Sequence, residues 1–270
     1  RNIRVKRNAS GVIEVMPLEE YIVGVLAGEM PIYFDSEALK AQAVASRSYA
    51  MKRIGYNKDN DYDVVDSVMN QVYLDNDYLK KAWGINYKEN INKLRSAVNE
   101  TLDEVMYYDN DIIDAMFFST SNGYTESSNA IFNLDLPYLK SKESLWDKDT
   151  SSAFKSSKKM SLNDFYSLLG LEYNKKLNYE VLERSGTNRI IKLKINGVEL
   201  NSKDVYNKLG LKSYDFSFVQ ENNDVIINAC GYGHGVGMSQ YGALGMAKEG
   251  YKYYDILKYY YTGITIDKIK

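Results

Sequence analysis

One glutamate, Glu29, closes the apolar run VGVLAGEMP near the start of the chain. A charged group among Val25, Leu26 and Met30 is costly to bury unless it is paired or has a function. Burial disfavours the ionised form of a carboxyl group and so raises its pKa, which suits a general acid acting near neutral pH. The alternative is a structural glutamate that caps a helix or pairs, for example with Arg47. The residue pattern alone does not decide between the two.

A second candidate site lies in CGYGHGVGMSQYG, where glycines at 231, 233, 235 and 237 permit sharp turns and close approach of a ligand. The order GxGxxG is absent, which argues against a dinucleotide site. Cys230 and His234 could form a nucleophile pair, but catalytic Cys and His usually come from distant segments. Zinc needs three or four ligands, and the chain has no other Cys or His. We therefore expect no metal and no cofactor. We expect His234 to lie in a loop that lines a ligand-binding site.

The segment FFSTSNGYTESS gathers hydroxyl groups with Asn122 and Gly123 after an expected strand. Such groups can exchange hydrogen bonds with sugar hydroxyls and acetamides. A polar surface turn is the alternative interpretation, and this segment alone does not exclude it.

Helices are expected to position these groups. The segment 17–31 places apolar residues and Glu29 at intervals of four, three and four, on one helical face, and Pro31 ends the helix. That face consists of Leu18, Ile22, Val25 and Glu29. A second helix is predicted over 35–53 with Asp35 or Ser36 as its cap, and a third over 87–108. A hairpin is predicted over 3–15, an extended segment over 63–75, and a strand from 111 into the polar loop.

The order of expected helices and strands along the chain predicts an α+β, two-lobed mixed fold with a substrate cleft between or beside the lobes. Residues 1–141 would form a catalytic lobe with the two helices and the STSNG loop. Residues 142–218, with strands over 178–184 and 189–200, a helix over 161–170 and the segment KDVYNKLGL, would form a second α+β lobe. Residues 219–270, with a strand over 224–230, would return the glycine-rich loop and a C-terminal helix to the first lobe.

Composition narrows the class of protein. The chain has 270 residues, 44% of them hydrophobic and 26% charged, as in ordinary globular proteins. A formal charge of −2 argues against a nucleic-acid partner. No apolar run reaches the length needed to span a bilayer. Because residue 1 is arginine, we expect the chain to begin inside a longer protein whose export signal or membrane anchor precedes it.

Several motifs occur in a characteristic order over more than 200 residues. They are LEEYIVGVLAGEMP, EALKAQAVASRSYAM, NQVY, FFSTSNGYTES, LPYLKS, LGLKSYDF and GYGHGVGMSQYGA. Together they resemble the stage II sporulation protein D family, which also includes the amidase-enhancer proteins. The resemblance implies that Glu29 is catalytic, because it occupies the position of the glutamate in the EMP signature. It also implies a set of substrate-binding residues, namely Gln42, Arg47, Gln71, Tyr73, Ser119, Thr120, Ser121, His234 and Gln240.

The same resemblance implies a lytic transglycosylase that cleaves peptidoglycan glycan strands, stripped of their stem peptides, during forespore engulfment. Ordinary glycosidases use two carboxylates. A lytic transglycosylase can use one, because the muramoyl 6-hydroxyl replaces water as the nucleophile. A glutamate without an obvious acidic partner fits this mechanism.

The implied partners are the amidase stage II sporulation protein P and the membrane protein stage II sporulation protein M. The implied location is extracytoplasmic and membrane-anchored, between mother cell and forespore. The alternatives are a non-catalytic glycan-binding scaffold that stimulates an amidase, and a hydrolase using Cys230 and His234. Phe118, Asn122, Tyr206 and the pair Ala229–Cys230 depart from the residues usual in the family.

Overall fold

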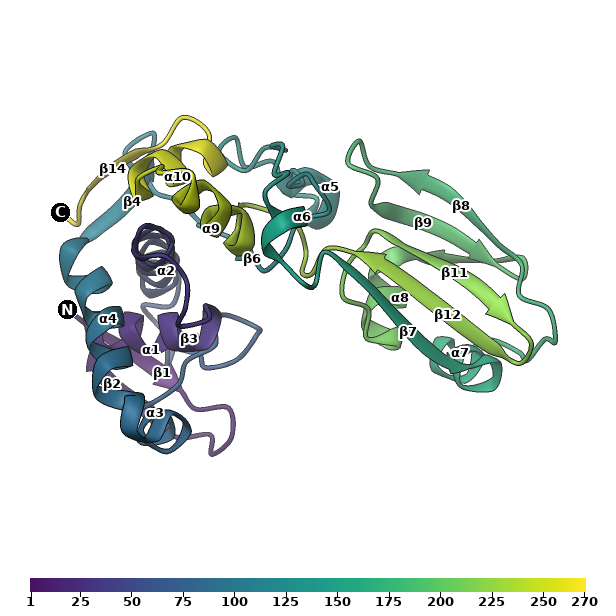
Figure 1. The fold of residues 1–270 in the computed structure, drawn as a ribbon, viewed down its shortest axis with the longest axis horizontal. Coiled ribbons are helices and arrows are strands. Elements are labelled where there is room, and N and C mark those ends of the chain that lie inside the picture. Colours follow the sequence, from purple (N-terminus) through teal and green to yellow (C-terminus); the bar gives the residue numbers. More distant parts are fainter. The chain divides into compact units, whose positions relative to one another are not determined.

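The computed structural model describes all 270 residues, and they form two compact units (Figure 1). Unit 1 consists of Arg1–Met116 together with Met246–Lys270, and unit 2 consists of Phe117–Gly245. The mixed α+β class is confirmed. The division falls at residues 116 and 245 rather than at 141 and 218. The polar loop and the glycine-rich loop therefore both lie in unit 2, and Glu29 lies in unit 1.

Unit 1 contains five α-helices, one short 3₁₀ helix and two small sheets. Its helices are α1 (Leu18–Glu29), α2 (Ser36–Tyr56), α3 (Asn76–Trp83), η1 (Gly84–Asn86), α4 (Tyr87–Glu100) and α10 (Tyr253–Tyr260). Its strands are β1 (Asn2–Lys6), β2 (Ile13–Pro17), β3 (Val64–Val65), β4 (Glu104–Tyr108), β5 (Asp111–Ile112) and β14 (Thr265–Lys268). The sheet orders are β2-β1-β3 and β14-β4-β5.

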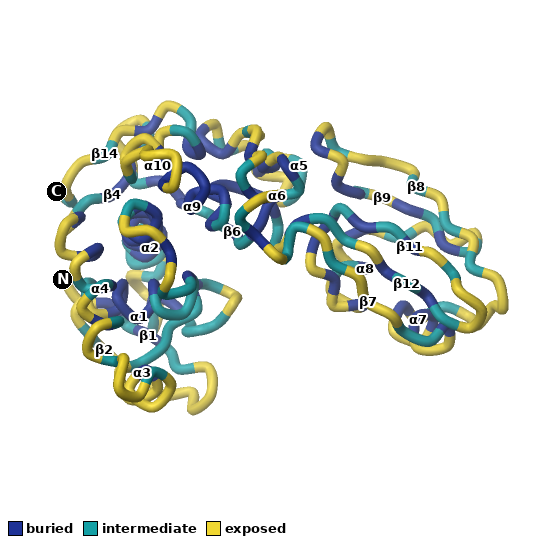
Figure 2. Tube along the Cα trace, in the orientation of Figure 1, coloured by how far each residue is buried: buried dark blue, intermediate teal, exposed yellow.

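Helix α2 is the centre of unit 1 and packs against α1, α4, α10 and β4 (Figure 1). Its residues from Ala38 to Ala50 are almost all buried, and many are alanines, which allow neighbouring elements to approach closely. The predicted cap is confirmed at Asp35, whose side chain accepts the Glu37 N–H at 2.8 Å. The buried residues of unit 1 are concentrated along α1 and α2 (Figure 2).

The predicted helix over 87–108 is wrong in its last third. Helix α4 ends at Glu100, and Asp103 takes a left-handed backbone conformation with φ of 62°. The residues Glu104–Tyr108 then form β4, paired with β14 from the other end of the chain. Valine and tyrosine favour strands, and the pairing partner lies about 160 residues away, so the local helical period was misleading.

Unit 2 contains three sheets and several short helices. Its strands are β6 (Phe117–Phe118), β7 (Lys155–Ser161), β8 (Tyr179–Arg184), β9 (Ile190–Ile195), β10 (Val198–Asn201), β11 (Phe216–Glu221), β12 (Asp224–Cys230) and β13 (Met238–Ser239). Its helices are α5 (Ser128–Phe132), α6 (Asp147–Thr150), α7 (Leu162–Leu169), α8 (Ser202–Leu209) and α9 (Gln240–Lys248), which runs on into unit 1. The sheet orders are β10-β9-β8, β11-β12-β7 and β13-β6. The predicted helix over 161–170 and the predicted strands over 178–184 and 224–230 are confirmed. The predicted strand over 189–200 is instead a hairpin of β9 and β10, because Asn196 and Gly197 both take a positive φ and form its turn.

One apolar core joins two of these sheets to α7 and α8. It includes Phe165, Ile190, Leu193, Val205 and Phe218. Strands β7 and β11 flank β12 on either side, which places three antiparallel strands side by side.

Candidate functional site

Glu29 is the last residue of α1 and is half-buried. Its Oε1 accepts the backbone N–H of Val72 at 2.7 Å. Met30 follows with an extended backbone and donates its N–H to the Leu26 carbonyl, so the helix ends at the carboxylate. The residue thus stands at an element end rather than within a fully buried stripe. Its carboxylate is oriented by a main-chain donor.

Two glycines of α1 bring the segment 70–74 against the helix. A Cβ on Gly24 would lie 2.3 Å from the Tyr73 ring, and a Cβ on Gly28 would lie 2.8 Å from both the Val72 side chain and its carbonyl oxygen. The Leu74 N–H donates to the Gly24 carbonyl at 3.1 Å. Glycine is required at both positions because any side chain would displace the segment that donates to Glu29.

The rest of this segment is fixed by aromatic and amide contacts. Tyr21 stacks on Tyr73 with ring centroids 5.4 Å apart, and its hydroxyl donates to Gln71 at 3.2 Å. The Gln71 amide donates to the Ser46 carbonyl at 3.3 Å. Burial raises the pKa of Tyr21 well above its usual value, and the charges of Tyr49 and Glu29 add to this effect. Tyr21 therefore stays neutral, and its hydroxyl holds the Gln71 side chain as a hydrogen-bond donor.

Arg47 is completely buried and supports the fold. Its guanidinium binds the Glu19 carboxylate with contacts of 2.7 and 2.9 Å and donates to the Glu104 carbonyl at 3.0 Å. It therefore joins α1 to β4 and pairs with Glu19 rather than with Glu29. Gln42 is also fully buried and donates to Ser46 at 2.9 Å. Their burial favours a structural role for both over contact with substrate.

A cavity of about 280 Å³ lies beside Tyr73 in unit 1. It is lined by Glu14, Met16, Glu20, Val23, Gly24, Tyr73, Leu74, Asn76 and Leu79. Glu29 is not among these residues. Of the predicted site residues, only Tyr73 faces this cavity.

The polar loop of unit 2 is organised by a buried carboxylate, Asp147. Its Oδ1 accepts the Ser121 N–H at 2.7 Å and also a hydrogen bond from Ser239, and its Oδ2 accepts the Ser144 hydroxyl at 2.6 Å. Burial raises the pKa of Asp147, and these hydrogen bonds oppose the rise. The Thr120 hydroxyl lies 3.1 Å from that of Ser119. Ser119 is half-buried, whereas the next two residues of the loop are buried.

Two backbone groups hold the His234 ring. Nδ1 accepts the Val236 N–H at 3.0 Å, and the ring also forms a hydrogen bond with the backbone of Phe117. The ring lies between Phe118 and Phe132, with centroids 5.8 and 5.5 Å away. Burial lowers the pKa of His234 to about 4, and the charge of Arg189 contributes. His234 is thus neutral near pH 7, and its contacts do not support a catalytic pair with Cys230.

Comparison with known proteins settles the family. The family model described as Stage II sporulation protein matches residues 6–108. The chain is 39% identical to stage II sporulation protein D of Bacillus amyloliquefaciens and 40% identical to that of Bacillus subtilis, covering 99% of this chain and 79% of each relative. The chain belongs to the stage II sporulation protein D family. It is also 29% identical to the amidase enhancer of Bacillus subtilis, covering 90% of this chain and 40% of that protein. Family membership supports a function in sporulation.

The family match spans α1, α2 and the segment 70–74, in which Val72, the donor to Glu29, stands between Gln71 and Tyr73. In unit 2 the structure brings Ser119, Thr120 and Ser121 together with the glycine-rich loop. The backbone groups of Thr120 and Tyr232 exchange two hydrogen bonds, of 2.7 and 3.0 Å. Gln240 is buried at the start of α9.

The sequence analysis missed a buried ion pair under the glycine-rich loop. Arg189 and Glu126 are 1% and 3% exposed, 4.0 Å apart, and Thr187 hydrogen-bonds to both. A Cβ on Gly235 would lie 2.6 Å from the Arg189 guanidinium. Glycine at position 235 therefore leaves room for the buried Arg189 side chain rather than for a ligand. The two charges stand 63 residues apart, and nothing in their local pattern indicated the pairing.

No three His, Cys, Asp or Glu side chains come together in a group that could hold a metal ion. No helix is long and apolar enough to cross a membrane.

Proposed function

We propose that this protein is a peptidoglycan lytic transglycosylase with Glu29 as its acid/base. The observation that carries the proposal is the position of Glu29 at the end of α1, half-buried and oriented by the Val72 N–H. A carboxyl group in that setting is held rigidly and is not wholly enclosed, as proton transfer to a bound substrate requires. The similarity to proteins named stage II sporulation protein D supports the assignment.

The reaction needs one carboxyl group. Protonated Glu29 would give its proton to the oxygen that joins C1 of N-acetylmuramic acid to N-acetylglucosamine, and the bond between C1 and that oxygen would break. The Glu29 carboxylate would then remove the proton from the muramoyl 6-hydroxyl, whose oxygen bonds to C1. The products are a 1,6-anhydro end and a free sugar hydroxyl. Glu29 ends protonated, as it began, and no water is consumed.

Glycan strands lie outside the cytoplasmic membrane, so the proposal places the protein there. An amidase that strips stem peptides would supply its substrate, which matches the expected partnership with stage II sporulation protein P. The similarity to the amidase enhancer favours a second candidate, a scaffold that binds glycan and stimulates such an amidase without cleaving the strand.

Mass spectrometry of peptide-free glycan strands tests the proposal. Wild type should release products ending in 1,6-anhydro-N-acetylmuramic acid, and Glu29→Gln should lower the rate by about 100-fold or more, since general acid–base catalysis contributes about 10²–10⁴-fold. Glu89→Gln is the control, because Glu89 lies exposed in the first turn of α4 and is not among the residues that line the cavity beside Tyr73. Strands that stay intact with wild type yet bind to both proteins would favour the scaffold.

A further inference from the structure

The outer face of the sheet β11-β12-β7 in unit 2 carries two rows of polar side chains. The strand register aligns Ser217, Asn228 and Ser157 across the three strands. Two residues along on each strand, the next row on the same face consists of Asp215, Cys230 and Lys155, since side chains alternate between faces. The Cys230 N–H donates to the Asp215 carbonyl at 2.9 Å, which continues the register beyond β11.

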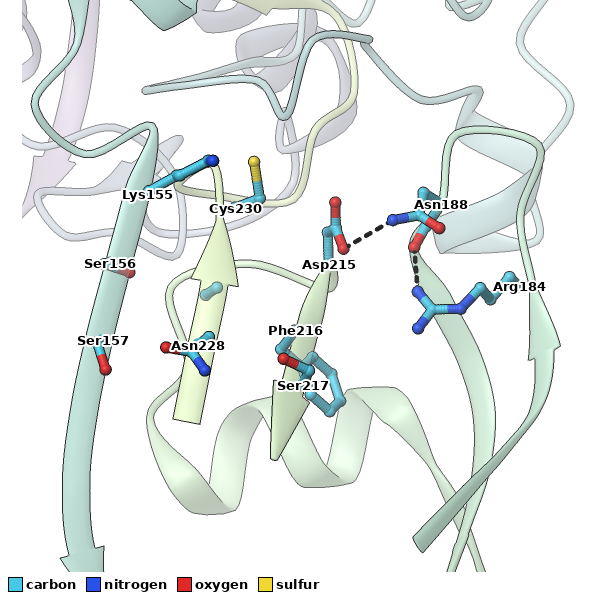
Figure 3. A pocket seen from close by; sticks show the side chains of 11 residues that line it. Lys155, Ser156, Ser157, Arg184, Asn188, Asp215, Phe216, Ser217, Asn228 and Cys230 are labelled. Atoms are coloured by element: carbon cyan, nitrogen blue, oxygen red, sulfur yellow. Dashed lines mark hydrogen bonds between the residues drawn. The ribbon is translucent and has the colours of Figure 1, made fainter. Parts of the chain in front are cut away.

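These rows form the floor of a cavity of about 610 Å³ that we call the sheet groove. Arg184 and Asn188, from the β8–β9 hairpin, form one of its sides, and Figure 3 shows Lys155 at the opposite side, beyond Asp215 and Cys230. The volume is within the usual range for small-molecule sites, about 300–1,000 Å³. The ring of Phe216 is buried in the core of unit 2. The groove therefore offers hydrogen bonds and charge rather than a stacking surface.

The charged side chains of the sheet groove differ in whether they have partners. The Asp215 carboxylate accepts the Asn122 amide at 2.8 Å and the Asn188 amide at 3.1 Å. Arg184 donates to the Asn188 carbonyl at 2.6 Å and forms no ion pair, and Lys155 forms none either (Figure 3). Two cations against one fixed carboxylate give the groove a formal charge of +1. That balance suits a ligand with a single negative charge among neutral polar groups, rather than a polyanion.

We propose that the sheet groove binds the lactyl carboxylate of N-acetylmuramic acid in a glycan strand whose stem peptide has been removed. The inference rests on the proposed function for its choice of substrate. Lys155 and Arg184 would pair with the carboxylate, and Ser157, Ser217 and Asn228 would bind sugar hydroxyls and acetamides. In a strand that keeps its peptide, the same carboxyl group is an uncharged amide. The groove would therefore select strands on which an amidase has already acted.

Cys230 provides a local readout, because it is the only cysteine of the chain and lines the groove. Its alkylation by iodoacetamide can be followed by mass spectrometry in the Glu29→Gln protein, which should leave added strands uncut. Peptide-free strand fragments should slow the alkylation. Fragments that carry the stem peptide, and chitooligosaccharides, which lack the lactyl group, should protect Cys230 far less. Equal protection by all three ligands, or by none, would overturn the proposal.

The variant Lys155→Gln/Arg184→Gln should raise the concentration needed for protection about tenfold or more, because it removes both cations that would pair with the carboxylate. Lys159→Gln is the matched control, since Lys159 lies on the same face of β7, outside the groove, paired with Asp224 at 2.9 Å. Unchanged protection in the double variant would overturn the inference.

This outcome is separable from the cleavage test. If wild type yields no 1,6-anhydro product but peptide-free strands still protect Cys230, the sheet groove stands as the binding site of a scaffold. If cleavage occurs and Cys230 is never protected, the groove proposal alone fails.

Discussion

At the scale of single residues, polar side chains that resemble ligands of a substrate can instead be internal partners of the fold. Arg47 has no exposed surface, and its donors are taken up by Glu19 and by backbone carbonyls of α4 and β4. A buried guanidinium must be paired in this way, because an unpaired charge in the core is too costly. The same helix position could equally have faced a groove, and only its neighbours decide which.

His234 gives a prediction about pH. Its pKa is about 4 in the folded protein, chiefly because of burial, against about 6.5 in the unfolded chain. The unfolded chain therefore binds more protons between these values, so stability is complete above pH 6.5 and is lost as the pH falls towards 4. We expect about 1–2 kcal/mol of such loss from this residue, after allowing for partial solvent access.

Thermal unfolding midpoints measured from pH 7.5 to pH 4.5 test this expectation. Wild type should lose more stability over that range than His234→Gln, which lacks the titrating group. Carboxylates protonate in both proteins, so only the difference between their pH profiles reports on His234. Parallel profiles would show that the histidine does not contribute.

At the scale of elements, α1 is shaped by the segment that packs on it. Gly28→Ala would gain about 1 kcal/mol of helix propensity but would place a Cβ 2.8 Å from Val72. Overpacking of this kind costs about 1–3 kcal/mol or more, so we expect a net loss of about 1–2 kcal/mol. Because Val72 donates to Glu29, cleavage of peptide-free strands should fall as well. Unfolding midpoints and product yields measure the two effects.

Gly55→Ala is the matched control for this substitution. Gly55 lies in the last turn of α2, and no atom stands within 4 Å of where its Cβ would be. The same chemical change should there stabilise the protein by about 0.5–1 kcal/mol. A stabilising Gly28→Ala would mean that the segment 70–74 is not held against α1 as described.

At the scale of the whole molecule, unit 1 is built from both ends of the chain, and unit 2 is inserted between them. Strand β14 pairs with β4, and α10 packs on α2 with Ile256, Leu257 and Tyr260 completely buried. Burying each such side chain contributes about 1.5–3 kcal/mol, and a whole domain is stable by only about 5–15 kcal/mol. Residues 246–270 are thus needed for residues 1–116 to fold.

A chain that ends at Gly245 should therefore lose the folded unit 1 but keep unit 2, which has its own core. Limited proteolysis should leave a resistant fragment spanning about residues 117–245. A chain that ends at Ile264 is the control, because it keeps α10 and loses only β14, and it should resist digestion in both units. Digestion of unit 2 at the same rate as unit 1 would contradict this independence.

The amino-acid sequence predicts the features that depend on neighbouring residues along the chain. The hairpin at the N-terminus, the Asp35 cap of α2, the end of α1 at Glu29 and helix α7 follow from turn residues, caps and periodicity. Glu29 was identified because a charge at the end of an apolar helix is locally unusual. The ordered motifs are sufficient to indicate the family.

The contacts between residues far apart in the sequence were established by the folded structure. The pairing of β4 with β14 overruled a helical pattern, and Arg47 took Glu19 as its partner rather than Glu29. The sheet groove exists only once three strands are in register, because Lys155, Asp215 and Cys230 are otherwise separate along the chain. The physical reason is that propensities and caps act within a few residues, whereas strand register and the burial of charge depend on contacts between segments far apart in sequence.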